Sequence, residues 1–214
     1  MAEHLQPATA RRRYHSPTRQ RQAEGTRGRI LDAARALFRD PGYAGTTLDA
    51  IAALATVSPK TVEATFGSKR GLLAALVDPV ASGTRYQALL DHLRDTPDPR
   101  RRVEAVAQLT RQVYEASVPE FDLLRGASVV THEVAEVARQ IGARRWQNQT
   151  RLIAYLDDRR ALRAGLAAEE AADVLWALTG YDLYRALVGE RGWAPARYEA
   201  WLADVLIQRL LTSG

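Results

Sequence analysis

The sequence predicts an all-α protein, and three observations lead to this prediction. Apolar residues recur three and four positions apart along most of the chain, and no segment shows the strict alternation typical of a β-strand. Proline and glycine interrupt this pattern at intervals that suit ordinary helices. The composition, 46% hydrophobic and 26% charged over 214 residues, is that of a globular protein with a sizeable core.

The first expected helix follows a segment of different composition. Residues 1–24 combine Pro, Ser, Gln and Arg with almost no apolar periodicity. We expect a disordered basic tail there, because such a segment cannot offset the entropy of ordering it. From Thr26 a helical pattern begins, and it stops at Asp40-Pro41-Gly42 because proline cannot continue a helix.

Two short helices should follow. Thr46 can cap a helix over about residues 47–55, with Asp49 as the third residue of an arrangement close to a capping box. After a tight turn at Thr56-Val57, Ser58-Pro59 begins the next helix, because serine suits the N-cap and proline the first helical position. This helix should end at Phe66-Gly67.

A fourth helix joins this region to the rest of the chain. Ser68 can cap it, and Asp78-Pro79 interrupts it. Because it links the two halves, this helix and its break are the expected couplers between them. Beyond residue 80 we expect six more helices, over residues 82–95, 99–117, 120–131, 134–160, 168–190 and 195–212.

Two short helices joined by a tight turn and supported by another helix form a helix-turn-helix, whose second helix enters the major groove of DNA. The segment from Thr46 to Phe66 has this layout. We therefore expect residues 25–77 to form a DNA-binding head. Four polar residues should lie on the outer face of its second helix: Lys60, Thr61, Glu63 and Thr65.

The positive charge also lies in the first third of the chain. Residues 1–70 hold 12 Lys and Arg against six Asp and Glu, whereas residues 71–214 hold 18 against 19. A basic head on a near-neutral body suits a polyanionic partner. Part of the charge belongs to the tail, which either contacts DNA or only solubilises the chain: Arg11, Arg12, Arg13, Arg19 and Arg21.

Short motifs follow one another through the head in a fixed order: Leu37-Phe38, Gly42-Tyr43, Thr46-Thr47, Ile51-Ala52, Val57-Ser58 and Phe66-Gly67-Ser68-Lys69-Arg70-Gly71-Leu72-Leu73. In order and spacing they resemble the TetR family of bacterial regulators, over about residues 26–77. The resemblance implies a transcriptional regulator, most often a repressor, that binds a palindromic operator in double-stranded DNA. Because the sequence has no membrane-spanning run and no signal-peptide core, we expect a cytoplasmic protein. It also implies that residues 80–214 form a helical domain that binds a small-molecule effector and forms a homodimer.

The resemblance implies roles for individual residues as well. Thr47 matches a phosphate contact at the start of the second helix, and Lys69 matches a lysine at the start of the fourth helix that holds a phosphate. Ser58 and Thr65 match positions that often touch the DNA backbone or bases. A lysine beside a helix N-terminus also suits an anion on physical grounds, because its charge adds to that of the unpaired N–H groups.

The expected recognition helix departs from the family pattern at Glu63, where a tyrosine is usual, and at Ala64, where a bulky residue is usual. Glu63 either accepts a hydrogen bond from a cytosine amino group or points back to Lys60 or Lys69. Lys60 is either a base or phosphate contact or a solvated surface charge. Anchoring to phosphate should then depend more on Thr47 and the lysines.

Wide apolar faces mark the last two expected helices. A four-helix bundle across a two-fold axis would bury them, although the same residues can be ordinary core. We expect a dimer interface that includes Trp176, Tyr184, Leu187, Trp201 and Val205. Because the resemblance places the effector among helices 99–160, we take as candidate contacts Tyr114, Asp122, His132, Trp146, Asn148 and Gln149.

Other classes of protein find little support in the sequence. It has no cysteine and no G-x-S-x-G, Walker or H-E-x-x-H motif, so we expect no enzyme, no cofactor and no metal site. No apolar run approaches the roughly 20 residues that cross a bilayer, so we expect no membrane partner. A DNA-binding or architectural protein without an effector is the remaining alternative.

Overall fold

The structure, a computed structural model, describes residues 17–77, 91–127 and 132–212. Within these ranges helices joined by loops account for the fold, together with a single β-bridge between Leu162 and Leu211. The elements are α1 (Pro17–Leu37), η1 (Phe38–Gly42), α2 (Leu48–Leu54), α3 (Pro59–Phe66), α4 (Lys69–Val77), α6 (Pro99–Ala116), α7 (Val118–Ala127), α8 (His132–Asp158), α9 (Ala168–Leu178), α10 (Tyr181–Tyr184), η2 (Arg185–Glu190) and α11 (Pro195–Leu210). The all-α prediction is confirmed.

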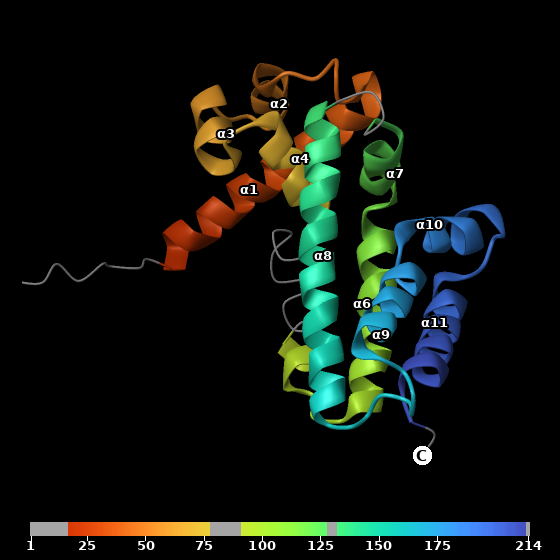
Figure 1. Cartoon of the computed structure of the whole chain (residues 1–214). Helices are drawn as coiled ribbons and strands as arrows, with labels where there is room; N and C mark the ends of the chain where they lie inside the picture. Colours follow the sequence, from red (N-terminus) through yellow and green to blue (C-terminus); the bar gives the residue numbers. More distant parts are fainter. Residues whose placement is uncertain (1–16, 78–90, 128–131, 213–214) are drawn as a thin grey trace, which may run out of the picture.

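The head consists of α1 to α4, with the short helices α2 and α3 packed beside α1 at one end of the molecule (Figure 1). Ile30, Ile51, Val62 and Leu72, one from each helix, are fully buried where the four helices meet. Their burial stabilises the unit because each aliphatic side chain removed from water contributes about 1.5–3 kcal/mol. This core holds α3 in place, so that its outer face is presented on a rigid support.

The core of the head continues into the body. Leu124 of α7 and Val134 and Val137 of α8 belong to the same cluster of buried side chains as the head residues. Helix α8 then runs from beside α4 to the far end of the molecule (Figure 1). A displacement of α8 would therefore change the packing of the head directly.

The body has a second core, built mainly by α6, α8, α9 and α11. Helix α11 lies along α6 and contributes Tyr198, Leu202 and Leu206, all fully buried, and Leu175 of α9 and Leu156 of α8 meet them. The apolar positions recur at helical spacing on each element. The residues of the second core are thus those that the helical periodicity of the sequence predicts to be buried.

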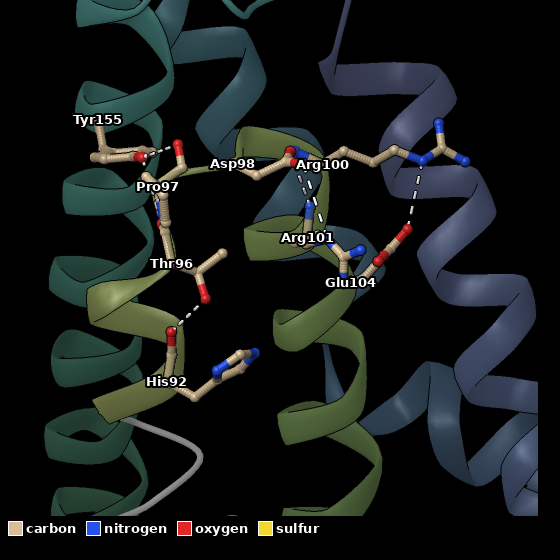
Figure 2. A network of polar contacts seen from close by, with 8 residues as sticks. All are labelled: His92, Thr96, Pro97, Asp98, Arg100, Arg101, Glu104 and Tyr155. Atoms are coloured by element: carbon tan, nitrogen blue, oxygen red, sulfur yellow. Dashed lines mark hydrogen bonds and ion pairs between the residues drawn. The ribbon is translucent and has the colours of Figure 1, made fainter.

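The end of the body farthest from the head is held by polar contacts of the loop before α6 (Figure 2). Asp98 caps α6 by accepting the N–H of Arg100 at 2.8 Å, and the Tyr155 hydroxyl of α8 donates to the carbonyl of Pro97 at 2.7 Å. The buried Arg102 donates from Nε to the carbonyl of Thr96 at 3.0 Å, with its guanidinium 3.5 Å from the centre of the Tyr155 ring. These bonds fix the far end of α8 to the start of α6.

The N-terminal boundary differs from the prediction. Residues 17–24, expected in the disordered tail, form the first turns of α1. Continuing a helix costs less than starting one, and arginine, glutamine and alanine have favourable helix propensities, so this segment needs no apolar face of its own. Residues 1–16, the rest of the predicted tail, lie outside the described residues.

The single helix predicted over 168–190 is wrong, because the chain leaves α9 at Thr179-Gly180 and restarts as α10 and η2. Arg145 of α8 donates to the carbonyls of Trp176 and Thr179, at 2.9 and 3.1 Å, which satisfies groups left open by the break. The buried Gln149 donates to the Thr179 hydroxyl at 2.6 Å. The break thus falls at a glycine and is held by contacts from a distant helix.

The other expected helices differ only at their ends. Helix α7 begins at Val118 rather than 120, and α8 spans 132–158 rather than 134–160. Of the helix expected over 82–95, residues 91–95 are helical and the rest lie outside the described residues, as do the Asp78-Pro79 break and residues 128–131.

Candidate functional site

The N-terminus of α2 is capped by Thr47 and not, as predicted, by Thr46. The Thr47 hydroxyl accepts the N–H of Ala50 at 3.1 Å. Thr46 is 3% exposed, and its hydroxyl lies 2.8 and 2.7 Å from the carbonyls of Leu37 and Gly42. The buried threonine therefore ties the loop to the end of α1, which leaves the exposed Thr47 at the helix N-terminus.

Lys69 lies against this N-terminus from the start of α4. Its ammonium donates to the carbonyls of Tyr43 at 2.8 Å and Thr46 at 3.0 Å and lies 4.5 Å from the centre of the Tyr43 ring. Two of its three N–H groups are thus used within the protein. The third N–H has no hydrogen-bond partner among the described residues, and the dipole of α2 favours negative charge at the same place.

Helix α3 begins as the sequence predicts. Ser58 accepts the N–H of Thr61 at 3.1 Å, and the two hydroxyl oxygens lie 2.8 Å apart. One turn later the Thr65 hydroxyl donates to the carbonyl of Thr61 at 2.7 Å. Each hydroxyl that is held in this way keeps acceptor capacity for a partner.

The turn between α2 and α3 places Thr56 at φ 56°, in the left-handed region. A β-branched residue is strained there, since its Cβ crowds the backbone. The turn closes through the N–H of Val57, which donates to the carbonyl of Ala52 at 3.0 Å. The exposed faces of α2 and α3 are therefore fixed by a turn of only a few residues.

Glu63, Lys60 and Thr65 are exposed on α3. Among the residues that the structure describes, neither Glu63 nor Lys60 forms an ion pair, and the ammonium of Lys69 is held by carbonyls instead. The arrangement thus gives no support to the alternative in which Glu63 points back to either lysine. The Glu63 carboxylate remains available to a partner.

Sequence reasoning missed three residues that border this surface. The guanidinium of Arg27 lies 4.5 Å from the centre of the Phe66 ring, at the end of α3, and Arg29 Nε donates to the carbonyl of Ala55, at the end of α2, at 3.4 Å. Both side chains place positive charge beside the two helices. Tyr43 is the third. The only signal for the arginines was their position in the first helix outside its apolar stripe.

Polar contacts join the head to the body. The hydroxyl of Tyr43 donates to Glu133, on the first turn of α8, at 3.1 Å, and Arg35 of α1 donates to Glu120 of α7 at 2.6 Å. Burial and the neighbouring Glu133 carboxylate raise the pKa of Tyr43, so its hydroxyl keeps its proton and remains a donor. Because Lys69 bonds to the carbonyl of Tyr43, one residue connects α8 to the N-terminus of α2.

The structure brings together two of the predicted effector residues, Tyr114 and Asp122. Tyr114 is buried and donates to the carbonyl of Thr179 at 2.8 Å. Its ring packs against Tyr181, with centroids 5.2 Å apart, and the hydroxyl of Tyr181 donates to Asp122 at 2.9 Å. Gln149 reaches the same region through Thr179.

His132, Trp146 and Asn148 are not brought into this group. His132 is exposed at the first residue of α8, and Asn148 is exposed with Arg151 at 3.5 Å. Trp146 is 37% exposed and packs edge-to-face on Trp176, with centroids 5.8 Å apart. Arg145, which the sequence did not single out, is instead the polar residue at the centre, 3.3 Å from the Tyr114 hydroxyl.

The residues predicted at a dimer interface fall into two groups. Tyr184 is 3% exposed and packs on Tyr198 in the core of its own protomer, so little of it is left for a partner. The others are partly exposed on α9, η2 and α11: Trp176, Leu187, Trp201 and Val205. A hollow of about 380 Å³, lined mainly by aliphatic side chains of α9 and α11, includes Val205.

The described part of the chain lacks two kinds of feature. No helix there is long and apolar enough to cross a membrane. No group of three or more His, Asp or Glu side chains among those residues is arranged to hold a metal ion.

A capped, outward-facing α3 on a three-helix support, beside a helix N-terminus with a lysine, defines a helix-turn-helix DNA-binding protein. Residues 30–76 match the family model described as bacterial regulatory proteins, tetR family. The match covers the head, so this part of the chain is a DNA-binding domain of the tetR-family type. No curated protein sequence matches the chain.

Several solved structures share the fold over most of the chain. NalD of Pseudomonas aeruginosa, the secondary repressor of the MexAB-OprM multidrug efflux pump, is 23% identical, with 89% of this chain and 98% of NalD covered and a TM-score of 0.66. The SmeT–triclosan complex is 24% identical, with 88% and 93% covered and a TM-score of 0.68. A transcriptional regulator of Saccharomonospora viridis in complex with choline is 20% identical, with 86% and 97% covered and a TM-score of 0.60.

Proposed function

We propose that the chain is a cytoplasmic, homodimeric repressor that binds a palindromic operator and is released from it by a small-molecule effector. The observation that carries the proposal is the connection from Glu133 through Tyr43 and Lys69 to the N-terminus of α2. It links a surface suited to DNA with a body suited to a ligand. Of the proteins with this fold, NalD is a repressor, and SmeT and the Saccharomonospora viridis protein have bound small molecules.

In this proposal the DNA contacts come from the two helix N-termini and the outer face of α3. Thr47 and Lys69 hold one phosphate at the start of α2, because they combine unpaired N–H groups, a hydroxyl and an ammonium. Residues of α3 contact the major groove: Ser58, Lys60, Thr61, Glu63 and Thr65. Glu63 selects cytosine, since a carboxylate accepts from the cytosine amino group.

The homodimer is proposed from the partly exposed apolar side chains of α9 and α11. The hollow beside Val205 can accept side chains of a second copy, since its lining is mainly aliphatic. A two-fold axis would then present two α3 helices to half-sites one helical turn, or a multiple of it, apart. Sedimentation at micromolar concentration should show a dimer, and a monomer would contradict this part of the proposal.

Release follows if the effector favours a position of α8 that changes the separation of the two heads. Arg145 and Gln149 lie on α8 beside the break between α9 and α10, whereas Glu133 on the same helix bonds to Tyr43. A ligand that rearranges the contacts of Arg145 and Gln149 therefore acts on the bond between Glu133 and Tyr43 through one continuous helix.

Operator binding can be tested with the full chain. Footprinting on the DNA upstream of its own and neighbouring genes should reveal a protected palindrome, and anisotropy titrations then give the affinity with and without ligands found by a thermal-shift screen. We expect some ligand to weaken binding at least about tenfold, the size of an ordinary allosteric coupling. Operator binding that no stabilising ligand alters would identify a constitutive DNA-binding protein instead.

A further inference from the structure

A cleft of about 260 Å³ opens on the body between the start of α7 and the segment formed by α10 and η2. Its lining includes aromatic, aliphatic and charged side chains: Asp122, Tyr181, Tyr184, Arg185, Val188 and Glu190. The volume is near the lower end for ligand pockets, roughly 300 Å³, so the cleft suits a small molecule. The π-helical η2 forms part of its wall, and such irregular turns are frequent at functional sites.

Packing behind the cleft fixes its aromatic rings. Tyr181 stacks on Phe121, with centroids 5.0 Å apart and an interplanar angle of 26°. Tyr184 packs edge-to-face on Tyr198, also at 5.0 Å, with an angle of 86°. The rings therefore need little reordering on binding, which lowers the entropic cost of holding a ligand.

The charge in the cleft is predominantly negative. Arg185 is neutralised by Glu190, with Nη2 and Oε1 2.6 Å apart. Asp122 is exposed, accepts the Tyr181 hydroxyl at 2.9 Å and forms no ion pair among the described residues. Burial and the Asp122 carboxylate raise the pKa of Tyr181, which therefore remains a neutral hydroxyl donor. One carboxylate, that of Asp122, is thus left uncompensated beside the fixed and partly exposed ring of Tyr181.

From this arrangement we infer that the cleft binds a small organic cation, an amine or quaternary ammonium with an apolar substituent. The cation lies against Asp122 and the partly exposed ring of Tyr181, which attract positive charge, while the substituent contacts Val188. An anion of the same size is repelled by Asp122. The inference rests on the proposed function in one respect, because it makes this cation the effector.

The test uses benzyltrimethylammonium and, as a charge-reversed ligand of similar size, phenylmethanesulfonate, each titrated into the full chain by calorimetry. The cation should bind saturably and the sulfonate should not. Asp122→Asn should weaken cation binding about tenfold, since it removes the charge that faces the ligand and leaves the rings. Asp182→Asn is the matched control. Asp182 is ion-paired with Arg125 at 2.7 Å and does not line the cleft, so binding should be unchanged.

Absence of cation binding at millimolar concentration, equal binding of the sulfonate, or an Asp122→Asn affinity equal to the parent's would each overturn the inference. Thermal melts confirm that both variants are folded. Anisotropy with operator DNA, run in parallel, separates the two hypotheses. A cation that binds without altering operator affinity would end its role as effector, and a chain that binds no operator would refute the proposed function whatever calorimetry shows.

Discussion

Between residues 21 and 77 the structure shows no buried side-chain nitrogen or oxygen without a hydrogen-bond partner, whereas five such atoms occur in the described part of the body: Glu120 Oε2, Arg145 Nε, Gln149 Oε1, Arg185 Nε and Tyr198 Oη. A buried polar atom without a partner costs about 1–3 kcal/mol. Head and body therefore differ in how completely their interiors are satisfied.

This difference suits the two tasks proposed for the molecule. The head presents a fixed surface, so its caps and loop contacts are complete before DNA arrives. The unsatisfied atoms of the body include Arg145 and Gln149, which bond to the residues around Thr179, and Arg185, which lines the cleft. A region that gains hydrogen bonds when a ligand or water enters is able to exist in more than one arrangement.

The largest effect is expected in the head, at the junction of α3 and α4. A Cβ on Gly71 would lie 2.0 Å from the carbonyl oxygen of Phe66. Gly71→Ala should therefore lower the free energy of unfolding by about 3 kcal/mol, as overpacking against a rigid backbone does. Urea unfolding measures the change.

Gly28→Ala is the matched control, because the added Cβ meets nothing within 4 Å in the interior of α1. It should raise the free energy of unfolding by about 1 kcal/mol through helix propensity. If both substitutions had the same sign, the head would not be the rigidly packed unit described above.

The second-largest change in the free energy of unfolding is expected from removal of the buried Thr46 hydroxyl in the head. Thr46→Val keeps the shape of the side chain and removes the group that bonds to the carbonyls of Leu37 and Gly42. We expect a loss of about 1–2 kcal/mol in the free energy of unfolding, since a buried carbonyl loses its donor. Thr47→Val, at the exposed cap, should cost less, about 1 kcal/mol. The reverse order would make Thr46 the functional cap after all.

Lys69→Met tests whether the lysine only supports the loop or also holds phosphate. If it does both, operator affinity falls about tenfold and the slope of log affinity against log salt decreases by roughly 0.9. Arg70→Met removes the same charge from the neighbouring, exposed position. The same decrease in slope for both variants, or an unchanged slope in Lys69→Met, would assign Lys69 a structural role alone.

The head was also the part that could be predicted more fully from sequence. Ser58-Pro59, Ser68 and Asp40-Pro41 act through their own turn of backbone, so local rules were sufficient for them. The choice between Thr46 and Thr47 could not be made this way, because two adjacent threonines have the same propensity. It depends on a bond from Thr46 to α1, nine residues away.

In the body, contacts between distant segments determine where α9 ends and which candidate effector residues come together, and neither could be predicted from the sequence. The end of α9 depends on Arg145, more than 30 residues earlier in the chain. Of the predicted effector residues, Tyr114 and Asp122 come together only because Tyr181 lies between them. Helical periodicity predicts which face of a helix is buried, but not which buried faces meet.

The smallest expected change has the opposite sign to that expected for Thr46→Val. The hydroxyl of Tyr198 is buried without a partner, and burial raises its pKa further, so the group is neutral and unsatisfied. Tyr198→Phe removes that oxygen and keeps the ring that packs on Tyr184, so the free energy of unfolding should stay constant or rise by about 0.5–1 kcal/mol. Chemical denaturation beside Thr46→Val makes the comparison direct. A loss as large as that of Thr46→Val would mean that the body satisfies this hydroxyl in solution, and the contrast between the two regions would then not extend to Tyr198.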